Sequence, residues 1–573
     1  MIALPQTPLD RWLPKLVLCL RQYNSRFFAA DVIAGLTVGL VALPLAMAFG
    51  IASGVTPQAG IYTAIVAGFL ISALGGSRTQ IGGPTGAFVV IIAGIVAKFG
   101  LPGLFMVTMM AGVMLVVMGA TGLGTAVKFI PRPVTIGFTN GIAVLIASTQ
   151  IRDFLGLQAG AIPGDFAGRM HVLFSHLNTI DPRTAFVACG SLAIIVLWPA
   201  VTKRFPGAII ALLAGTLAVI VFKLPVDTIG SKFGGIPTGL PWPKVPTFRA
   251  DLILTLLPSA LTVALLAAVE SLLSAVVADG MSGDKHSSNV ELIAQGVANL
   301  ASPLFGGIPA TGAIARTATN IRSGAKTPIA GMVHALTLVA ILLVAAPLAR
   351  FIPLATLAAV LFVVAYNMGE WREIGGILKL SRADIAVWGT TFALTILADL
   401  TVAVEVGMAL AALLYIYRIS QTTTVATVTP EYIEHGRAHI LQDKDVPPYV
   451  TILRIHGPFL FGTTDKLTEE TEDLTRFASV IVLRVRNMTA IDATGLHALE
   501  RFSDRLRKTG RVLLVCGARE QPARMLKQAE FIRHIGKQNI LPHVEAALNR
   551  AKEVNMALER PGQEISAVHR VGV

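Results

Sequence analysis

Long apolar runs alternate with short polar connections through the first 420 residues of the chain. A helix needs roughly 20 apolar residues to cross the hydrocarbon core of a membrane. Runs of about this length lie at 32–51, 57–76, 103–121, 136–155, 183–200, 206–223, 251–279, 326–346, 353–369, 382–397 and 400–420. Three further apolar stretches are short or interrupted, at 85–99, 289–304 and 311–322. The pattern predicts a polytopic α-helical membrane protein with 14 segments and with both termini on one side of the membrane.

Beyond residue 420 the pattern changes to short runs rich in β-branched residues that alternate with helical stretches. Strands are predicted at Val450–Ile455, Val480–Val485 and Arg511–Val515, and helices near 464–475, 493–508, 522–530 and 543–556. Strands that alternate with helices predict a small α/β domain. The predicted parts are an N-terminal segment 1–26, a transmembrane domain 27–420, a linker 421–447, an α/β domain 448–556 and a disordered tail 557–573.

The composition supports a membrane protein, since only 14% of the residues are charged and 54% are hydrophobic, whereas soluble domains carry about 25% charged residues. The net charge of +13 does not indicate nucleic-acid binding, because the basic residues sit between the apolar runs. They gather in the even-numbered connections, at Lys128, Arg132, Lys203, Arg204, Lys285, Arg322, Lys326, Arg372, Lys379 and Arg418. The positive-inside rule therefore predicts a multi-pass protein of the inner (plasma) membrane with cytoplasmic N- and C-termini. Four basic residues between segments seven and eight run against this rule: Lys223, Lys232, Lys244 and Arg249.

The chain has no pattern that supplies a nucleophile or a metal cluster. It lacks HExxH, GxSxG and Walker A patterns. Cys19, Cys189 and Cys516 lie too far apart in the sequence for a CxxC metal site or a disulfide framework. We therefore expect no enzymatic activity, no cofactor and no metal.

Two stretches in the membrane part resemble each other. Thr85-Gly86-Ala87 and Thr311-Gly312-Ala313 are 226 positions apart, and Phe28–Ile33 and Phe248–Ile253 form a second pair with an offset of 220. These landmarks predict a duplication, with halves at about 27–225 and 248–420. Seven segments in each half would make the halves inverted relative to each other. In transporters, short segments with Gly and Pro in matching positions of two halves indicate the binding site.

The two repeated stretches have the chemistry of an anion site. Pro and Gly interrupt the helix, so a half-helix is predicted to begin inside the membrane near Thr85 and another near Thr311. The first turn of a helix has free backbone N–H groups and carries partial positive charge, which suits an anion without any metal. Arg316, one turn further on, would add a full positive charge. The alternatives are that the small residues only pack helices together and that Arg316 reaches the surface from a helix end.

Glu270 is the other costly residue within the apolar segments. An ionisable residue inside the membrane is by default a functional hypothesis. It would either neutralise Arg316 when no substrate is bound or take up a proton together with an anion. The alternative is a fixed buried ion pair.

With these residues the chain resembles the SulP (sulfate permease-like) anion transporter family. The resemblance is carried by Pro44–Phe49, Gly60–Tyr62, Gly82–Ala87, Val269–Ser271, Ser302–Gly307, Pro309–Arg316, Ser323–Thr327 and the tail. It implies a 7+7 inverted repeat with a core and a gate domain, an elevator-type movement and a homodimer. It also implies a substrate held between the third and tenth segments, with side chains from the first segment.

The resemblance assigns residues to these roles. The substrate-binding positions that it implies are Leu45, Phe49, Thr85, Gly86, Ala87, Ala313, Ile314, Ala315 and Arg316, and Glu270 matches an acid that is associated with proton coupling in some members. Leu45 stands where many members have glutamine, and Ala313 and Ala315 stand where animal members often have serine. With fewer hydroxyl groups, this chain would depend more on its backbone N–H groups.

The tail resembles a STAS domain, the fold shared with anti-sigma factor antagonists. Asp492-Ala493-Thr494-Gly495 matches their phosphorylation loop, with Thr494 at the acceptor position, so Thr494 is a candidate for regulatory phosphorylation. The alternative is that Asp492 or Thr494 only caps the helix that follows.

Together these observations predict a secondary active anion transporter, by proton-coupled symport of sulfate or a related oxyanion or dicarboxylate. The alternatives are a bicarbonate or chloride exchanger and an uncoupled anion channel. The expected partners are a small inorganic or organic anion, protons, the lipid bilayer and a second copy of the chain.

Overall fold

The computed structural model describes residues 12–125, 131–160, 162–202, 206–236, 238–239, 242–398, 400–428, 446–528 and 531–559. The chain divides into two compact units, Met1–Ala411 and Ala412–Val573. Most of the predicted linker 421–447, nearly all of the tail 557–573 and the first 11 residues of the N-terminal segment lie outside the described residues. So do Lys128, Lys203 and Arg204 of the basic connections.

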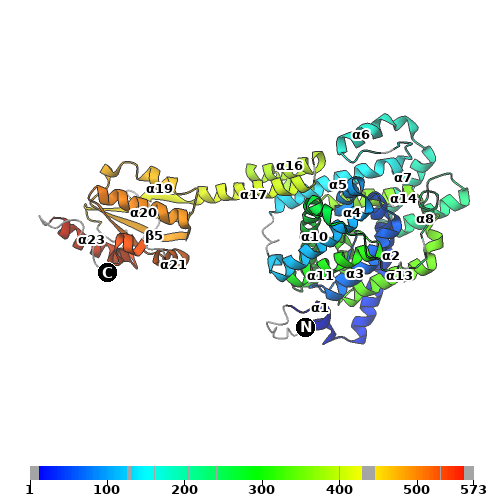
Figure 1. Ribbon diagram of the computed structural model, residues 1–573, viewed down its shortest axis with the longest axis horizontal. Helices are drawn as coiled ribbons and strands as arrows, with labels where there is room; N and C mark the ends of the chain where they lie inside the picture. The colour runs from blue at the N-terminus through cyan, green and yellow to red at the C-terminus, as the bar shows by residue number, and fades with distance from the viewer. Residues whose placement is uncertain are drawn as a thin grey trace. The chain divides into compact units, whose positions relative to one another are not determined.

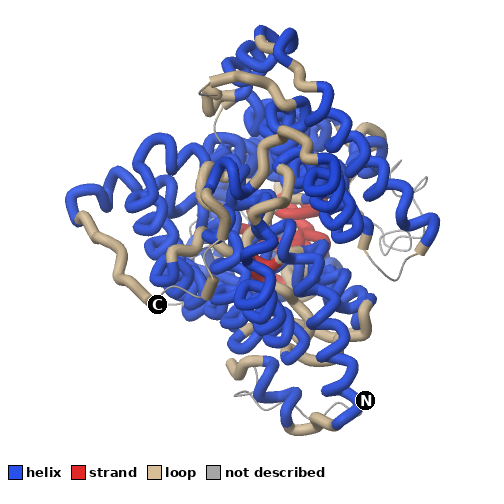
Figure 2. The backbone as a smooth tube through the Cα atoms, turned by 90° about the vertical axis from the view of Figure 1, so that its right-hand side faces the viewer, coloured by secondary structure: helices blue, strands red, loops and turns tan. Residues whose placement is uncertain are grey.

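The first unit is built of helices, which Figure 2 draws in blue. The helices at the predicted segments are α2 (Ser25–Ala52), α3 (Pro57–Leu74), α4 (Gly86–Ala120), α5 (Arg132–Leu155), α7 (Pro182–Val201), α8 (Gly207–Phe222), α10 (Ile253–Ser282), α11 (Ser288–Ala301), α12 (Ile314–Arg322), α13 (Ile329–Ala349), α14 (Leu354–Met368), α16 (Arg382–Leu397) and α17 (Leu400–Thr422) (Figure 1). Gly100, with a φ of 67°, breaks α4 into two segments. Every predicted segment is therefore helical, and eight helices among the described residues are long and apolar enough to cross a membrane. The prediction of a polytopic helical fold is confirmed.

Four short α-helices among the described residues of the first unit were not predicted: α1 (Lys15–Leu20), α6 (Phe166–Ser175), α9 (Ile229–Phe233) and α15 (Trp371–Ile377). None has the length of a span, so a search for long apolar runs does not find them. Local signals do fix their ends. The Asp165 side chain accepts a hydrogen bond from the backbone N–H of Gly168 at the start of α6, and Thr228 and Ser231 form a capping box at α9.

The spanning helices form two groups by their mutual packing. The core group contains α2, α3 and α4 with α10, α11, α12 and α13, and the gate group contains α5, α7, α8, α14 and α16. Each half of the chain therefore supplies its earlier helices to the core group and its later helices to the gate group. This arrangement follows the predicted duplication.

A two-stranded ribbon joins the two halves in the middle of the core group. Strand β1 (Gly82–Gly83) pairs antiparallel with β2 (Thr311–Gly312), with Gly82 opposite Gly312 and Gly83 opposite Thr311. The backbone N–H of Ala313 extends the pairing by donating to the Ile81 carbonyl at 2.8 Å. The repeated stretches thus lie side by side, and a short half-helix follows each of them.

The second unit is an α/β domain with a five-stranded sheet in the order β3-β4-β5-β6-β7. The strands are β3 (Thr424–Thr427), β4 (Val450–Phe459), β5 (Val480–Ile491), β6 (Val512–Cys516) and β7 (Ile540–Leu541), and β3 pairs antiparallel while the others pair parallel. The helices are α19 (Asp465–Glu470), α20 (Ala493–Lys508), α21 (Glu520–Gln528), α22 (Phe531–Ile535) and α23 (Val544–Leu558). One apolar cluster includes residues of α20, α21 and α22 and the other includes residues of α23, so the central strands are buried on both faces. The three predicted strands are confirmed, and β3 and β7, both short and at the edges, were not predicted.

Candidate anion-binding site

A cavity of about 340 Å³ lies where the core and gate groups meet. All nine residues predicted to bind substrate line it, together with Glu270: Leu45, Phe49, Thr85, Gly86, Ala87, Glu270, Ala313, Ile314, Ala315 and Arg316. These residues come from four helices and their N-caps, separated by up to 271 positions between Leu45 and Arg316. The structure therefore brings the whole predicted set into one place.

Two helix N-termini contribute to the cavity wall. Thr85 is the N-cap of α4 and Ala313 is the N-cap of α12, and both have extended backbone. Neither side chain caps its own helix. Neither helix start is therefore capped by its N-cap side chain, and the partial positive charges of the two dipoles lie at the same cavity.

Arg316 is buried in this cavity, with 2% of its surface exposed. Its Nη2 donates to the carbonyl of Pro84, which belongs to the other half of the chain. Its Nη1 has no hydrogen-bond partner among the described residues. Arg316 therefore does not extend to the protein surface, and its Nη1 is buried beside Gly83 without a hydrogen-bond partner among the described residues.

Gly83 leaves the space that this guanidinium occupies. A Cβ at this position would lie 2.7 Å from Nη1 of Arg316, which is closer than atoms can pack. Gly83 also has a φ of 147°, in a region that favours glycine. A side chain at this position would therefore force the Arg316 guanidinium to shift from its place beside the ribbon.

Glu270, on α10, accepts a hydrogen bond from the Thr85 hydroxyl, with Oγ1 and Oε2 2.9 Å apart. Arg316 lines the same cavity, but it donates to the Pro84 carbonyl and forms no ion pair with Glu270. The fixed buried ion pair that we considered as an alternative is thus not present between these two described residues. Glu270 is therefore hydrogen-bonded to Thr85, the N-cap of α4, and Arg316 is hydrogen-bonded to the carbonyl of the preceding residue, Pro84.

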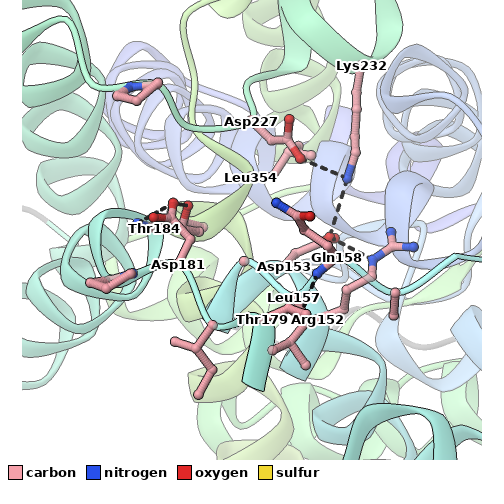
Figure 3. Close-up of a pocket in the computed structure, with 16 residues that line it drawn as sticks. Arg152, Asp153, Leu157, Gln158, Thr179, Asp181, Thr184, Asp227, Lys232 and Leu354 are labelled. Atoms are coloured by element: carbon pink, nitrogen blue, oxygen red, sulfur yellow. Dashed lines mark hydrogen bonds and ion pairs between the residues drawn. The ribbon is translucent and has the colours of Figure 1, made fainter. Parts of the chain in front are cut away.

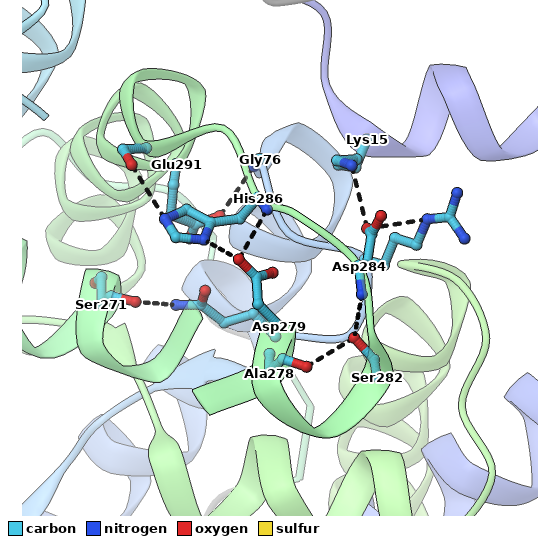
Figure 4. Close-up of polar contacts among 12 residues, drawn as sticks. Lys15, Gly76, Ser271, Ala278, Asp279, Ser282, Asp284, His286 and Glu291 are labelled. Carbon is cyan, nitrogen blue, oxygen red and sulfur yellow. Dashed lines mark hydrogen bonds and ion pairs between the residues drawn. The ribbon is translucent and has the colours of Figure 1, made fainter. Parts of the chain in front are cut away.

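The residue that follows Glu270 anchors α10 to the ribbon. The Ser271 hydroxyl lies 2.7 Å from the hydroxyl of Thr311 and accepts from the backbone N–H of Gly312 at 3.1 Å. Gln80 donates from Nε2 to the Ser271 carbonyl at 3.1 Å (Figure 4). Thr317 in turn accepts from the backbone N–H of Ile81 at 3.0 Å. These polar contacts hold Glu270 at a fixed position relative to both half-helices, and our sequence reasoning assigned no role to Gln80 or Thr317.

The gate group supplies a second wall that the sequence did not reveal. Ten lining residues were not predicted. Leu266, Val269 and Leu273 lie on α10 of the core group, and the other seven belong to α5 and α14 or follow α14: Thr135, Phe138, Thr139, Val364, Asn367, Met368 and Glu370. The lining residues of α5 and α14 lie outside the repeated sequence stretches. They are identified only by their position in the structure, across the cavity from the ribbon. Thr135 lies in the first turn of α5 and Met368 at the end of α14, both next to connections that the positive-inside rule places in the cytoplasm.

A second and more polar cavity, of about 660 Å³, lies at the opposite ends of α5 and α14. Lys232 bridges two carboxylates there, Asp153 at 3.6 Å and Asp227 at 3.2 Å, and Arg152 also contacts Asp153 (Figure 3). A hydrogen bond from the Thr184 hydroxyl lowers the pKa of Asp181, which caps α7. Both cations in this cavity are therefore already paired with carboxylates.

The predicted phosphorylation loop lies at the start of α20. Asp492 caps this helix by accepting from the backbone N–H of Gly495 at 2.8 Å, and its other carboxylate oxygen accepts from the backbone N–H of Phe461, after β4, at 2.9 Å. Thr494 is exposed in the first turn. The geometry gives Asp492 the capping role, and phosphorylation of Thr494 stays a prediction.

Comparisons with known proteins agree with this architecture. The sequence matches the Sulfate permease family over residues 28–391 and the STAS domain over residues 442–547. The putative sulfate transporter YvdB of Bacillus subtilis is 43% identical over 523 residues, which cover 91% of this chain and 97% of that protein. The transmembrane domain of the cyanobacterial bicarbonate transporter BicA is 33% identical with a TM-score of 0.60 and covers 68% of this chain and 98% of that one.

A likeness in fold extends over nearly the whole chain. The murine Slc26a9 anion transporter, in its inward-facing state, has a TM-score of 0.83 at 18% identity and covers 96% of both chains. This chain therefore belongs to the sulfate permease family and is a membrane-embedded anion transporter with a C-terminal STAS domain.

Proposed function

We propose that the chain is a secondary active carrier that moves a small oxyanion together with protons. The observation that carries this proposal is the cavity whose wall contains two helix N-termini without side-chain caps and the buried side chain of Arg316. Backbone N–H groups and a guanidinium are the donors that oxyanions bind in proteins. The mainly apolar remainder of the wall keeps water away and strengthens these contacts.

Proton coupling is proposed from the charges in the cavity. An anion beside Arg316 also lies near the Glu270 carboxylate, and two negative charges in a place of low dielectric oppose each other. Protonation of Glu270 removes that conflict. The Thr85 hydroxyl can still donate to Oε2 of Glu270 when the proton is bound to the other carboxyl oxygen. Anion binding and proton binding therefore favour each other, as symport requires.

Sulfate is the first substrate to test, because the relative that is 43% identical is named a putative sulfate transporter. Bicarbonate is the second, because the chain is 33% identical to a domain of a bicarbonate transporter. Dicarboxylates are a third class that a guanidinium could bind. An exchanger and an uncoupled channel remain the mechanistic alternatives.

The movement that we propose is of the elevator type. The ribbon, both half-helices and Glu270 belong to the core group, whereas α5 and α14 belong to the gate group. A shift of the core group against the gate group would carry the site across as one piece. We place the carrier in the inner (plasma) membrane as a homodimer with cytoplasmic termini.

Transport into sealed proteoliposomes tests the proposal. We expect the wild-type protein to accumulate sulfate, or bicarbonate, against its gradient when an inward proton gradient is imposed. Glu270→Gln should abolish accumulation driven by the proton gradient but leave exchange of internal for external anion intact. Asp251→Asn, at an exposed site before the same helix, is the matched control. A Glu270→Gln variant with the full pH-driven component would refute the coupling role, and an absence of accumulation by the wild type would favour a channel.

A further inference from the structure

Glu370 has a strained backbone at the end of the gate wall. It lies just after α14, with a φ of 42° and a ψ of 37°. Among the described residues only three other than glycine have positive φ, and the other two, Lys223 and Glu520, line no cavity described here. A left-handed conformation is unfavourable for a residue with a Cβ, because the Cβ comes too close to the backbone. Such strain persists where the surroundings impose it, and it is a recurrent feature of functional sites.

The surrounding turn is fixed by three separate contacts. Asn140 of α5, which is fully buried, donates to the carbonyl of Gly369. The indole N–H of Trp371 donates to the Tyr366 carbonyl at 2.9 Å. Arg132 of α5 pairs with Glu373 of α15 at 2.7 Å. The turn therefore holds Glu370 in one position relative to α5.

Glu370 changes the charge of the anion cavity. Three charged residues line the cavity: Glu270, Arg316 and Glu370. Arg316 is buried, whereas Glu370 is exposed, so the cavity runs from a buried cation to an exposed carboxylate. Outside the cavity, Arg132 and Glu373 act on Glu370 electrostatically, and they are already paired with each other.

An acidic residue at the opening of an anion cavity opposes binding from that side. Glycine or asparagine would fit the left-handed turn without strain, so the backbone does not explain the choice of glutamate. The opening lies at the end of α14 and the start of α5, the side that the basic connections predict to be cytoplasmic. The carboxylate lies where an anion would leave the cavity into the cell.

We propose that Glu370 is a release residue: its negative charge lowers the affinity of the cavity for the anion on the cytoplasmic side and thereby speeds release. This inference rests on the proposed function, since it takes the cavity of Arg316 as the transport site. Glu370 is not required to hold the anion. It makes the two directions of transport unequal.

The test is the half-saturating anion concentration measured from each side of vesicles in which the full chain has a single orientation. We expect Glu370→Gln to lower this concentration about threefold or more on the cytoplasmic side, because it removes a charge of the same sign as the anion from the opening of the cavity. The value for the opposite side should not change. If charge is the cause, the gain in affinity for sulfate, a dianion, should be about the square of the gain for a monoanion such as bicarbonate.

Matched variants separate charge from backbone strain. Glu370→Asp keeps the charge and should behave like the wild type, whereas Glu370→Asn and Glu370→Gly relieve the strain and should behave like Glu370→Gln. Asp251→Asn, at an exposed acidic residue outside the cavity, is the control and should leave both half-saturating concentrations unchanged. Equal effects on both sides, or no change with Glu370→Gln, would refute a release role. Normal transport by Arg316→Ala would instead overturn the proposed site itself.

Discussion

Replacement of Arg316 by alanine is the sharpest test of the anion site. The guanidinium is 2% exposed and supplies the cavity with its one positively charged side chain among the lining residues. Truncation removes that charge and the free Nη1 donor together. Because the helix N-termini remain, we expect the Arg316→Ala cavity to keep weak affinity for anions rather than none.

The magnitude follows from the burial of this side chain. Removal of one partner from a buried, hydrogen-bonded charge pair costs about 2–5 kcal/mol of binding free energy. At about 1.4 kcal/mol for each factor of ten, the dissociation constant for the anion should rise roughly 30- to 4000-fold. Arg316→Lys should give an intermediate loss, because an ammonium group keeps the charge but cannot contact both the Pro84 carbonyl and an anion with a planar fork.

Equilibrium binding of radiolabelled sulfate to the purified protein measures this change directly, with uptake into proteoliposomes as the second readout. Arg322→Ala is the matched control, since Arg322 is exposed at the end of the same helix. The Pro84 carbonyl loses one partner in Arg316→Ala, so the melting temperature of each variant must be compared with the wild type. A folded Arg316→Ala protein with unchanged affinity would refute the role of this residue.

Two further predictions concern a glycine and a thiol. Gly83→Ala should displace the Arg316 guanidinium and weaken anion binding at least tenfold, because the new Cβ would lie 2.7 Å from Nη1 and the φ of Gly83 is 147°. Gly94→Ala is the control and should bind normally, because a Cβ there meets open space. A Gly83→Ala variant with unchanged anion binding would contradict the packing argument. Burial raises the pKa of the Cys516 thiol to about 11, so this thiol is neutral at pH 7 and should resist maleimide until the STAS domain unfolds. Mass spectrometry of the labelled intact protein checks this, and rapid modification of native Cys516 at pH 7 would contradict it.

The helices and the half-helix starts could be predicted because each follows from a local rule. Span length sets the apolar runs, and the Pro and Gly residues around Thr85 and Thr311 predict two half-helix starts. The first half-helix begins at Gly86, with Thr85 as its N-cap, whereas the second begins at Ile314, because Thr311 and Gly312 form β2. The two copies of the Thr-Gly-Ala sequence then indicated that both starts belong to one site. Their direct pairing as β1 and β2 was not predicted, since two residues are too few for a strand pattern.

The rest of the site could not be predicted because it depends on which helices meet. Thr139 of α5 and Val364 of α14 lie within apolar runs that fit a lipid-facing helix and a cavity wall equally well. Hydropathy predicts that a side chain is shielded from water, but it does not predict whether that side chain faces lipid or another helix. The strain at Glu370 is likewise invisible in the sequence, because a turn after a helix does not disclose its φ.

The pairing of the ribbon explains how a single arginine of one half contacts the other half beside the cavity. Because β1 and β2 are antiparallel, their half-helices begin near each other and leave the ribbon in opposite directions, so both positive dipole ends face one cavity. Arg316 reaches from the start of α12 to the Pro84 carbonyl beside the start of α4, in the space that Gly83 leaves open. If Gly83 acts only by admitting this guanidinium, its substitution should cost little further affinity once Arg316 is alanine. The double variant would then bind like Arg316→Ala alone, whereas additive losses would mean that Gly83 shapes the site independently.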